Sequence, residues 1–352
     1  MKKKTSKVIF IGAIDVGNVA TNGETMKNQM LLKRFEDLFD KVVAVDAYQW
    51  RRRPWVFLKI LWKLVGNSGA KVVISASGAA GKLYKFLHYV PLKRNVYDWV
   101  IGGSRAYRIR QGVYKIDVLK GLNKIIVEGN TMVAELNAMG LDNVVRVPNF
   151  KPVDYIPVKN NGKEKEKMRF VFLSRVHPNK GIKEIVDASI ALNAQGYENR
   201  YEVNFYGPLD DNYRQEFEVQ IAPMANVNYR GFLNLMGTSG YDQLAGYDVM
   251  LFPTYWDGEG FPGVVIDAYI AGLPIIASDW NMNREVVTDG DTGFIIPVHD
   301  SVVLADKMKG YIEGELDLAT MSRKCQEMAK QFDYRNVVTK ELLVELGLID
   351  NE

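Results

Sequence analysis

Short β-branched runs alternate with longer segments of helical apolar spacing along this chain, and that alternation limits the folds open to it. In the first half the β-branched runs fall at residues 7–14, 41–48, 71–77 and 124–129. Between the first two runs, residues 23–39 place Met26, Met30 and Leu31 at helical spacing. Strands that alternate with helices form βαβ units, so we expect a parallel sheet.

The same rhythm begins again after residues 144–167, which contain three prolines, end in charged residues and lack periodicity. Further strand-like runs fall at residues 168–176, 201–207, 227–231, 247–253, 273–278 and 292–297. We therefore predict two Rossmann-like, doubly wound α/β domains facing each other across a cleft, residues 1–150 and 151–330. Ligands of such sheets bind beyond the carboxyl ends of the strands, so functional residues should follow strands directly.

Length and composition agree with this architecture. The chain has 352 residues, enough for two cores, and its 47% apolar and 25% charged residues are typical of a soluble globular protein. Its single cysteine, Cys325, cannot form an internal disulfide, which favours a reducing compartment. The apolar run at residues 8–14 is short, β-branched and followed by a glycine-containing loop, so it predicts a strand rather than a signal peptide. No run of about 18 apolar residues occurs, so we expect no transmembrane helix.

Charge divides the chain in two. Residues 1–150 hold 25 Lys and Arg against 11 Asp and Glu, whereas the remaining residues hold 20 against 31. Halves of opposite charge suggest two domains that meet different partners.

The segment EGFPGVVIDAYIAGLPIIASD, residues 259–279, combines two carboxylates with a helix start. Pro262 suits the first helical position, which would leave the backbone N–H groups of Gly263 and Val264 free in the first turn. Such a helix start after a strand is an anion site, while Asp267 one turn deeper suits hydroxyl groups and Glu259 lies in the loop before it. On spacing alone, a solvated loop and an ordinary polar helix face remain equally open for the two acids.

A second polar group, SRVHPNKG, follows the strand predicted at residues 168–173. Arg175 and Lys180 lie across a Pro/Asn turn just before a helix. Two cations at the end of a parallel strand suit a diphosphate, with the arginine making bidentate contacts and the lysine acting as a point charge. Two solvated surface cations are the alternative.

These segments together resemble a known family. SRVHPNKGIKEIVDA, followed by EGFPGVVIDAYIAGLPIIASD, is similar to family 4 of the retaining glycosyltransferases, which have the GT-B fold. TNGETMKNQML, VVRVPNF, FYGP, YRGF, TDGDTGFII and FDYRNVV extend the resemblance over nearly the whole chain. In detail it is closest to the branch that builds bacterial capsular and other surface polysaccharides.

The resemblance implies roles for the two carboxylates and the two cations. The family's E-x7-E motif falls on Glu259, which would contact hydroxyls of the donor sugar, and on Asp267, which would hold the ribose. Arg175 and Lys180 match the pair that neutralises the donor diphosphate. With Glu259 they are the residues expected to act in catalysis.

Backbone contacts to the donor are implied as well. Gly263 and Val264 would donate amides to the phosphates, and Leu233 lies where the family contacts the base. Gly207, in FYGP, is a further expected donor-site residue.

The chain departs from the family at two places. Asp267 replaces a glutamate and reaches one methylene less. The loop where family members often carry a histidine reads Val100–Ser104 without one, so no catalytic histidine is assigned. The DGD at Asp289–Asp291 resembles a metal motif but reads better as a turn before a strand, and no metal site is expected.

The resemblance also implies a mechanism. Retaining transfer in this family is written as departure and attack on one face of the sugar, so the protein need only stabilise charge on the leaving diphosphate. Arg175, Lys180 and the helix start at Gly263 would do so in place of a divalent metal. We expect no cofactor, and a UDP-sugar rather than a GDP-sugar as co-substrate.

The glycine-containing loop after the first strand is the expected acceptor side. Its assigned residues are Gly12, Asp15, Asn22 and Gly23. Residues 331–352 are expected to form a helix that crosses back to the first domain, as in the family.

The segment RRRPWVFLKILWKLVG, residues 51–66, is basic, apolar and rich in tryptophan. Cations that meet anionic head groups and tryptophans at the interface favour a membrane-surface helix, whereas the alternative is an ordinary core helix with a basic entry. The residues assigned to membrane contact are Arg51, Arg52, Arg53, Trp55, Lys59, Trp62 and Lys63. The same charge could attract nucleic acid, but no recognition motif supports that.

The sequence thus predicts a metal-independent, retaining hexosyltransferase that moves a sugar from a nucleotide sugar to a lipid-linked saccharide. It would be cytoplasmic and peripheral at the inner face of the plasma membrane. One alternative is an NAD(P)-dependent oxidoreductase with Gly12, Gly17 and Asp46, although Ile14 occupies the position where a side chain would block the pyrophosphate. A catalytically silent sugar-nucleotide-binding protein is the other.

Overall fold

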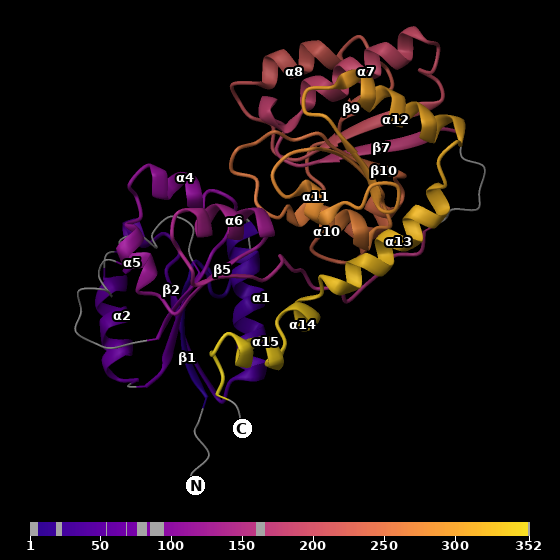
Figure 1. Ribbon diagram of the computed structural model, residues 1–352. Helices are drawn as coiled ribbons and strands as arrows, with labels where there is room; N and C mark the ends of the chain where they lie inside the picture. The colour runs from indigo at the N-terminus through magenta and orange to yellow at the C-terminus, as the bar shows by residue number, and fades with distance from the viewer. Residues whose placement is uncertain are drawn as a thin grey trace. The chain divides into compact units, whose positions relative to one another are not determined.

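The computed structural model describes residues 6–18, 23–53, 55–67, 69–75, 83–84, 95–159 and 166–350. The chain divides into two compact units (Figure 1). Unit 1 comprises Met1–Pro152 and Phe332–Glu352, and unit 2 comprises Val153–Gln331. Each unit contains a six-stranded sheet whose paired strands are all parallel, which confirms the predicted α/β architecture.

Unit 1 has the strand order β2-β1-β3-β4-β5-β6. The strands are β1 (Lys7–Gly12), β2 (Lys41–Asp46), β3 (Lys71–Ser75), β4 (Val96–Trp99), β5 (Lys124–Val127) and β6 (Val144–Arg146). The helices are α1 (Gly23–Leu38), α2 (Val56–Val65), α4 (Arg105–Arg110), α5 (Ile116–Lys120), α6 (Asn130–Ala138), α14 (Tyr334–Val337) and α15 (Lys340–Glu345), with a 3-10 turn at Trp50–Arg52. Because β2 and β3 lie on either side of β1, the chain reverses direction across the sheet beside β1, and ligands bind at such a point.

The last residues of the chain pack into the core of unit 1. Tyr334, Val338 and Leu343 share one buried cluster with Phe35 of α1 and Trp99 of β4. The α1 and α14 helices lie together on one side of the sheet, and α2 lies on the other (Figure 1).

Polar contacts fix the same terminal segment. Tyr97 Oη donates a 2.7 Å hydrogen bond to the carbonyl of Gly347, and Arg34 Nε donates one of 2.8 Å to the carbonyl of Val338. Lys71 pairs with Asp350 at 2.7 Å. The segment after residue 331 therefore completes unit 1.

Unit 2 has the strand order β12-β11-β10-β7-β8-β9. The strands are β7 (Met168–Leu173), β8 (Tyr201–Tyr206), β9 (Val227–Tyr229), β10 (Val249–Phe252), β11 (Ile275–Ser278) and β12 (Gly293–Ile296). The helices are α7 (Ile182–Ala194), α8 (Arg214–Ile221), α9 (Thr238–Ala245), α10 (Gly263–Ile270), α11 (Asn283–Val286), α12 (Ser301–Glu313) and α13 (Leu318–Gln331), with a 3-10 turn at Pro178–Lys180.

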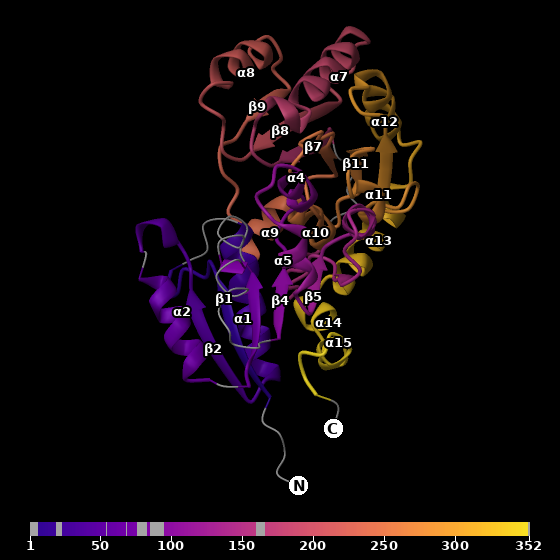
Figure 2. The same ribbon diagram turned by 60° about the vertical axis from the view of Figure 1, so that its left-hand side comes forward.

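Helices cover both faces of this sheet, because the chain reverses direction between β9 and β10. The α7 and α12 helices pack together on one face, and α10 and α13 pack together on the other (Figures 1 and 2). The reversal makes the carboxyl ends of β7 and β10 the topological switch point, where ligands of such sheets bind.

Candidate active site

Two polypeptide turns meet at the switch point of unit 2. One follows β7 and contains residues 174–181, and the other follows β10 and contains residues 253–262. Gly181 has a φ of +74°, and a Cβ there would lie 2.2 Å from the carbonyl oxygen of Pro253. Only glycine permits both that conformation and that approach, so Gly181 is required for the two turns to touch.

The carbonyl of Asn179 connects the two turns. It accepts a 2.9 Å hydrogen bond from the backbone N–H of Tyr255, and Thr254 Oγ1 lies 3.5 Å from it. His177 caps the 3-10 turn, since its Nδ1 accepts from the backbone N–H of Asn179 at 3.2 Å. His177 thus belongs to this turn.

An ion pair joins the side chains that the two turns present. Lys180 Nζ donates to Glu259 Oε2, and the two side chains are only 11% and 14% exposed. Thr254 Oγ1 donates to the same carboxylate oxygen at 3.3 Å, and the ammonium lies 5.8 Å from the centre of the Trp256 ring. An ammonium has three donors, so Lys180 can hold Glu259 and still donate to an anionic ligand.

Arg175 lies on the β7 turn but differs from Lys180. Its side chain is exposed, and within the described part of the chain it forms no ion pair or hydrogen bond. The structure therefore brings Lys180 and Glu259 together and leaves the Arg175 guanidinium in solvent.

The turn that carries Glu259 leads into α10, whose start adds backbone donors. Gly263 and Val264 are its first two residues and are partly exposed, while the Val265 N–H bonds to the carbonyl of Pro262. Pro262 is the N-cap residue rather than the first helical residue, which corrects the predicted helix start by one position. Its extended ψ of 113° places it outside the helix.

Asp267 lies one turn further into α10 and is buried. Its Oδ1 accepts a 2.8 Å hydrogen bond from Tyr241 Oη, a residue of α9 that sequence reasoning missed. Burial, followed by the charge of Asp267, raises the pKa of Tyr241, so the phenol stays protonated and remains a donor. The sequence around Asp267 does not indicate this partner, because the hydrogen bond joins residues 26 positions apart.

Gly207 and Leu233 lie at the neighbouring strand ends. Gly207 has a φ of +132°, and a Cβ there would lie 1.9 Å from the carbonyl oxygen of Ser174, so its backbone packs directly on the β7 turn. Its N–H bonds to the carbonyl of Gly231 at 2.8 Å, and the side chain of Leu233 is buried in the loop that follows.

A third loop, after β11, supports the one that carries Glu259. Trp280 Nε1 donates to the carbonyl of Trp256 at 2.9 Å, and Asn281 Nδ2 donates to the carbonyl of Glu259 at 3.1 Å. Asn281 has a φ of +46°, a left-handed conformation that asparagine tolerates better than most residues. Sequence reasoning assigned no role to either residue.

Behind the site, Glu184 of α7 pairs with His299 through Oε1 and Nδ1 at 2.7 Å. The His299 ring lies 4.1 Å from the ring of Tyr255. Burial, followed by the charge of Glu184, raises the pKa of Tyr255. This cluster holds the β10 loop from the side of α7 and α12.

The predicted metal-like DGD lies in the turn before β12, as the sequence favours. Asp289 Oδ1 accepts from the backbone N–H of Ile295 at 2.9 Å, and Asp291 pairs with Lys324. Among the described residues, no three His, Cys, Asp or Glu side chains lie close enough to share a metal ion.

In unit 1, the structure describes three of the four predicted acceptor-side residues, and Asn22 lies outside the described residues. Gly12 ends β1, where a Cβ would lie 2.8 Å from the carbonyl oxygen of Ser75, and Gly23 begins α1. Asp15 has a φ of +54°, and its Oδ1 accepts from Asn18 Nδ2 at 2.9 Å.

The carboxylate of Asp46, which an oxidoreductase would use for a ribose, is engaged by backbone amides of this loop and of Tyr48. That engagement disfavours the dinucleotide alternative.

The α2 helix presents an apolar stripe to solvent. Val56, Ile60 and Leu64 are buried against the unit. Trp55, Leu58, Trp62 and Val65 are all at least 60% exposed. Spacing of three and four residues places these four on one face, and sequence reasoning assigned only the two tryptophans to it.

Cations border the apolar stripe. Arg52, Arg53 and Lys59 are exposed, and Lys63 lies 4.6 Å from the centre of the Trp62 ring. Arg51 belongs to the 3-10 turn, but its side chain lies outside the described residues. No helix in the described part of the chain is long and apolar enough to cross a membrane.

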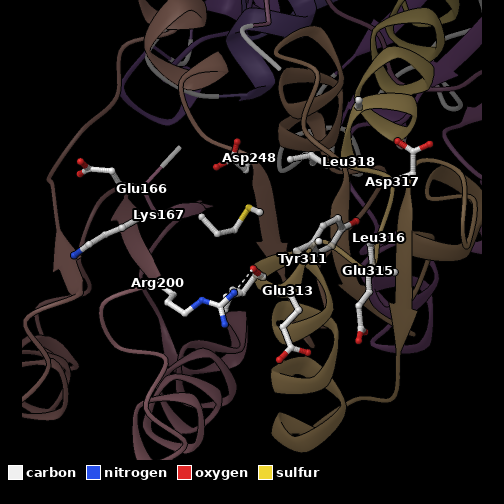
Figure 3. Close-up of a pocket in the computed structure, with 14 residues that line it drawn as sticks. Glu166, Lys167, Arg200, Asp248, Tyr311, Glu313, Glu315, Leu316, Asp317 and Leu318 are labelled. Carbon is white, nitrogen blue, oxygen red and sulfur yellow. Dashed lines mark hydrogen bonds between the residues drawn. The ribbon is translucent and has the colours of Figure 1, made fainter. Parts of the chain in front are cut away.

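A pocket of about 1000 Å³ opens at the opposite edge of the unit 2 sheet (Figure 3). Lys167 and Met168 at the start of β7, Arg200 before β8 and Asp248 before β10 line it, together with residues 311–319. Arg200 donates a 3.1 Å hydrogen bond to the carbonyl of Ile312 across it. None of the predicted site residues lies in this pocket.

In a comparison with known protein families, residues 167–313 match the family described as Glycosyl transferases group 1. The chain is 26% identical over 249 residues to a phosphatidyl-myo-inositol mannosyltransferase of Mycolicibacterium smegmatis, covering 68% of this chain and 61% of that one. It is 24% identical over 180 residues to the putative colanic acid biosynthesis glycosyltransferase WcaL of Escherichia coli, covering 50% of this chain and 44% of that one. The chain thus spans about half the length of the curated relatives it matches.

Among solved structures, the Anabaena protein HepE in complex with UDP superposes with a TM-score of 0.70 at 15% identity. The match covers 97% of this chain and 99% of that one. Likeness at this identity concerns the fold.

Proposed function

Because residues 167–313 match the family described as Glycosyl transferases group 1, we propose that this chain is a retaining glycosyltransferase. It would move a hexose from a nucleotide-diphosphate sugar to a saccharide acceptor in surface polysaccharide biosynthesis. The observation that carries the proposal is the Lys180–Glu259 pair at the switch point of unit 2, whose glutamate lies on the turn that leads into α10.

Each group at the site has a role in this reaction. Charge on the leaving diphosphate would be balanced by Lys180, by the exposed Arg175 side chain and by the amides of Gly263 and Val264. Glu259 would accept hydrogen bonds from hydroxyls of the transferred sugar, and Asp267 from the ribose.

These groups supply fixed positive charge without a divalent ion, so we propose a metal-independent transfer with no cofactor. A preorganised ammonium and a helix start act where charge develops, which is the requirement for a diphosphate leaving group. Likeness of fold to a UDP-bound protein supports UDP as the nucleotide of the donor.

The acceptor side is proposed for unit 1, with Gly12, Asp15, Asn22 and Gly23 around the β1–α1 loop. The exposed stripe of α2 supports a place at an anionic membrane surface, because tryptophans and leucine would enter the head-group layer while cations meet lipid phosphates. We therefore propose a lipid-linked saccharide acceptor and a peripheral position at the inner face of the plasma membrane.

The test is transfer of radiolabelled sugar from a panel of nucleotide sugars to lipid-linked saccharides, followed by NMR of the new anomeric centre. Wild type should use one donor with retention, while Lys180→Ala and Glu259→Gln should abolish transfer without unfolding. Lys183→Ala and Asp257→Ala are matched controls, since both side chains are exposed. Lys183 lies at the start of α7, just after the β7 turn, and Asp257 lies on the β10 turn. Inversion of the anomeric centre, or full activity of Lys180→Ala, would overturn the proposal.

A further inference from the structure

We propose that Asp46 is a positioning residue, which shapes the β1–α1 loop and so places Asp15 toward the acceptor. This inference rests on the proposed transferase function and names a residue which that function does not yet include. Asp46 ends β2, whereas the loop it organises follows β1, its neighbour in the sheet.

The carboxylate of Asp46 gathers backbone amides. Oδ1 accepts from the N–H groups of Ile14 at 3.0 Å and Asp15 at 3.2 Å. It also accepts from Tyr48 at 2.9 Å, and Oδ2 receives a longer contact, 3.4 Å, from the Val16 N–H. Three consecutive residues of one loop therefore point their amides at a single carboxylate. Hydrogen bonds to a charged acceptor are stronger than those between neutral groups.

The carbonyls of the same loop are held from the other side by α1. Gln29 Nε2 donates to the carbonyls of Ile14 at 2.9 Å and Asn18 at 3.1 Å. Asn28 Nδ2 donates to the carbonyl of Ala13 at 3.1 Å. Residues 13–18 of the loop are thus held from two sides, through amides bound by Asp46 and carbonyls bound by α1.

That conformation includes an unfavourable backbone angle. Asp15 has a φ of +54°, and its N–H is one of the groups that Asp46 binds. Left-handed conformations of residues other than glycine persist only where surrounding contacts enforce them, and they gather at functional sites. The enforced residue carries a partly exposed carboxylate at the carboxyl end of β1, beside the strand reversal of unit 1.

A carboxylate at Asp46 is needed for this arrangement. An asparagine retains one acceptor oxygen for Ile14, Asp15 and Tyr48 but turns an N–H₂ donor toward the Val16 amide. Asp46→Asn should therefore lose only the contact with the Val16 amide and loosen the loop in part. Asp46→Ala should release all four amides.

The experiment uses the full chain, with steady-state kinetics in which donor and acceptor are varied separately. Asp46→Asn should raise the acceptor KM by about tenfold, and Asp46→Ala by more, while the donor KM stays within about twofold. Asp142→Asn, an exposed change elsewhere in unit 1, is the control and should match wild type. Hydrogen exchange of the amides of residues 14–16 should accelerate in both Asp46 variants, with the remainder of the sheet protected.

An unchanged acceptor KM, or a rise in both KM values together with a lowered melting temperature, would overturn the positioning role. Unchanged exchange at residues 14–16 would overturn it independently of any activity. If wild type transfers no sugar, the proposed function fails, and the exchange result still decides whether Asp46 shapes the loop.

Discussion

Lys180 and Glu259 form an ion pair although they are 79 residues apart in the sequence. One follows β7 and the other follows β10, so the pair bridges the strand reversal of unit 2. Because both side chains are largely buried, removal of either leaves a partly desolvated charge without its partner. The pair therefore both joins the β7 and β10 turns and keeps a charged group at the site.

Lys180→Ala should lower kcat by at least about a hundredfold, because a fixed donor to the leaving diphosphate is lost. Lys180→Arg should not restore full activity, since a planar guanidinium cannot replace a compact ammonium between Glu259 and a phosphate. Transfer kinetics with circular dichroism as a fold check would measure both, and Lys183→Ala should behave as wild type. Activity of Lys180→Ala within threefold of wild type would remove Lys180 from the mechanism.

Tyr241→Phe should weaken nucleotide binding by roughly three- to tenfold, because Asp267 loses the donor that orients it. Calorimetric titration with UDP would measure this. Tyr197→Phe is the control, because that phenol donates to Glu313 of α12 at the opposite edge of the sheet. If Asp267→Ala binds UDP with the affinity of wild type, Asp267 does not hold the ribose.

Chelation should leave transfer intact. In the proposed site an ammonium and helix amides balance the charge of the leaving diphosphate, so activity in excess EDTA should stay within about twofold of untreated enzyme. Loss of activity in EDTA, with recovery on addition of Mg²⁺ or Mn²⁺, would contradict the metal-free mechanism.

Leu58→Ser and Trp62→Ser should each reduce sedimentation with phosphatidylglycerol vesicles, because both side chains belong to the exposed stripe of α2. Raised salt should weaken binding as well, since head-group attraction to the bordering cations is screened. Val219→Ser on α8 is a control of similar exposure in unit 2. If Leu58→Ser and Trp62→Ser sediment with vesicles as much as Val219→Ser and wild type do, α2 is not the membrane contact.

Tyr97→Phe should alter stability in alkaline solution. Burial, followed by the charge of Asp350, raises the pKa of Tyr97 to about 12. In the unfolded chain this phenol ionises near pH 10, so its contribution is complete below about pH 10 and is lost as pH rises toward 12.

The variant should therefore be less stable than wild type by roughly 1 kcal/mol at pH 8, through loss of the hydrogen bond to Gly347. Its stability should also fall less between pH 10 and 12. Urea unfolding across that range would measure both effects, with the exposed Tyr107→Phe as a control. An identical pH dependence of wild type and Tyr97→Phe would show that the pKa of Tyr97 is not raised in the folded protein.

Ten of the twelve described strands were predictable, because each is a short strand-like run and helical segments alternate with them. The sequence analysis missed β4, and it missed β6 because that strand lies at the start of the segment interpreted as a domain boundary. The sequence also indicates the polar groups at the switch point, since Arg175, Lys180 and Glu259 follow directly after such runs. The resemblance assigned their chemistry, and those roles stay predictions.

The remaining features depend on contacts between distant residues. Nothing near Asp267 indicates Tyr241, and nothing near Glu259 indicates that Trp280 and Asn281 hold its loop from β11. Pro262 was placed one residue too far into α10, because a proline satisfies the φ of both an N-cap and a first helical residue. Leu58 and Val65 were missed on α2 because an apolar residue on a helix is ordinarily buried.

The most direct measurement is calorimetric titration of wild type and Lys180→Ala with a panel of UDP-sugars and GDP-sugars. We expect one UDP-sugar to bind wild type, binding to fall at least about tenfold in Lys180→Ala, and Lys183→Ala to bind as wild type does. Failure of every nucleotide sugar to bind wild type, or equal binding by wild type and Lys180→Ala, would contradict a donor site at the Lys180–Glu259 pair.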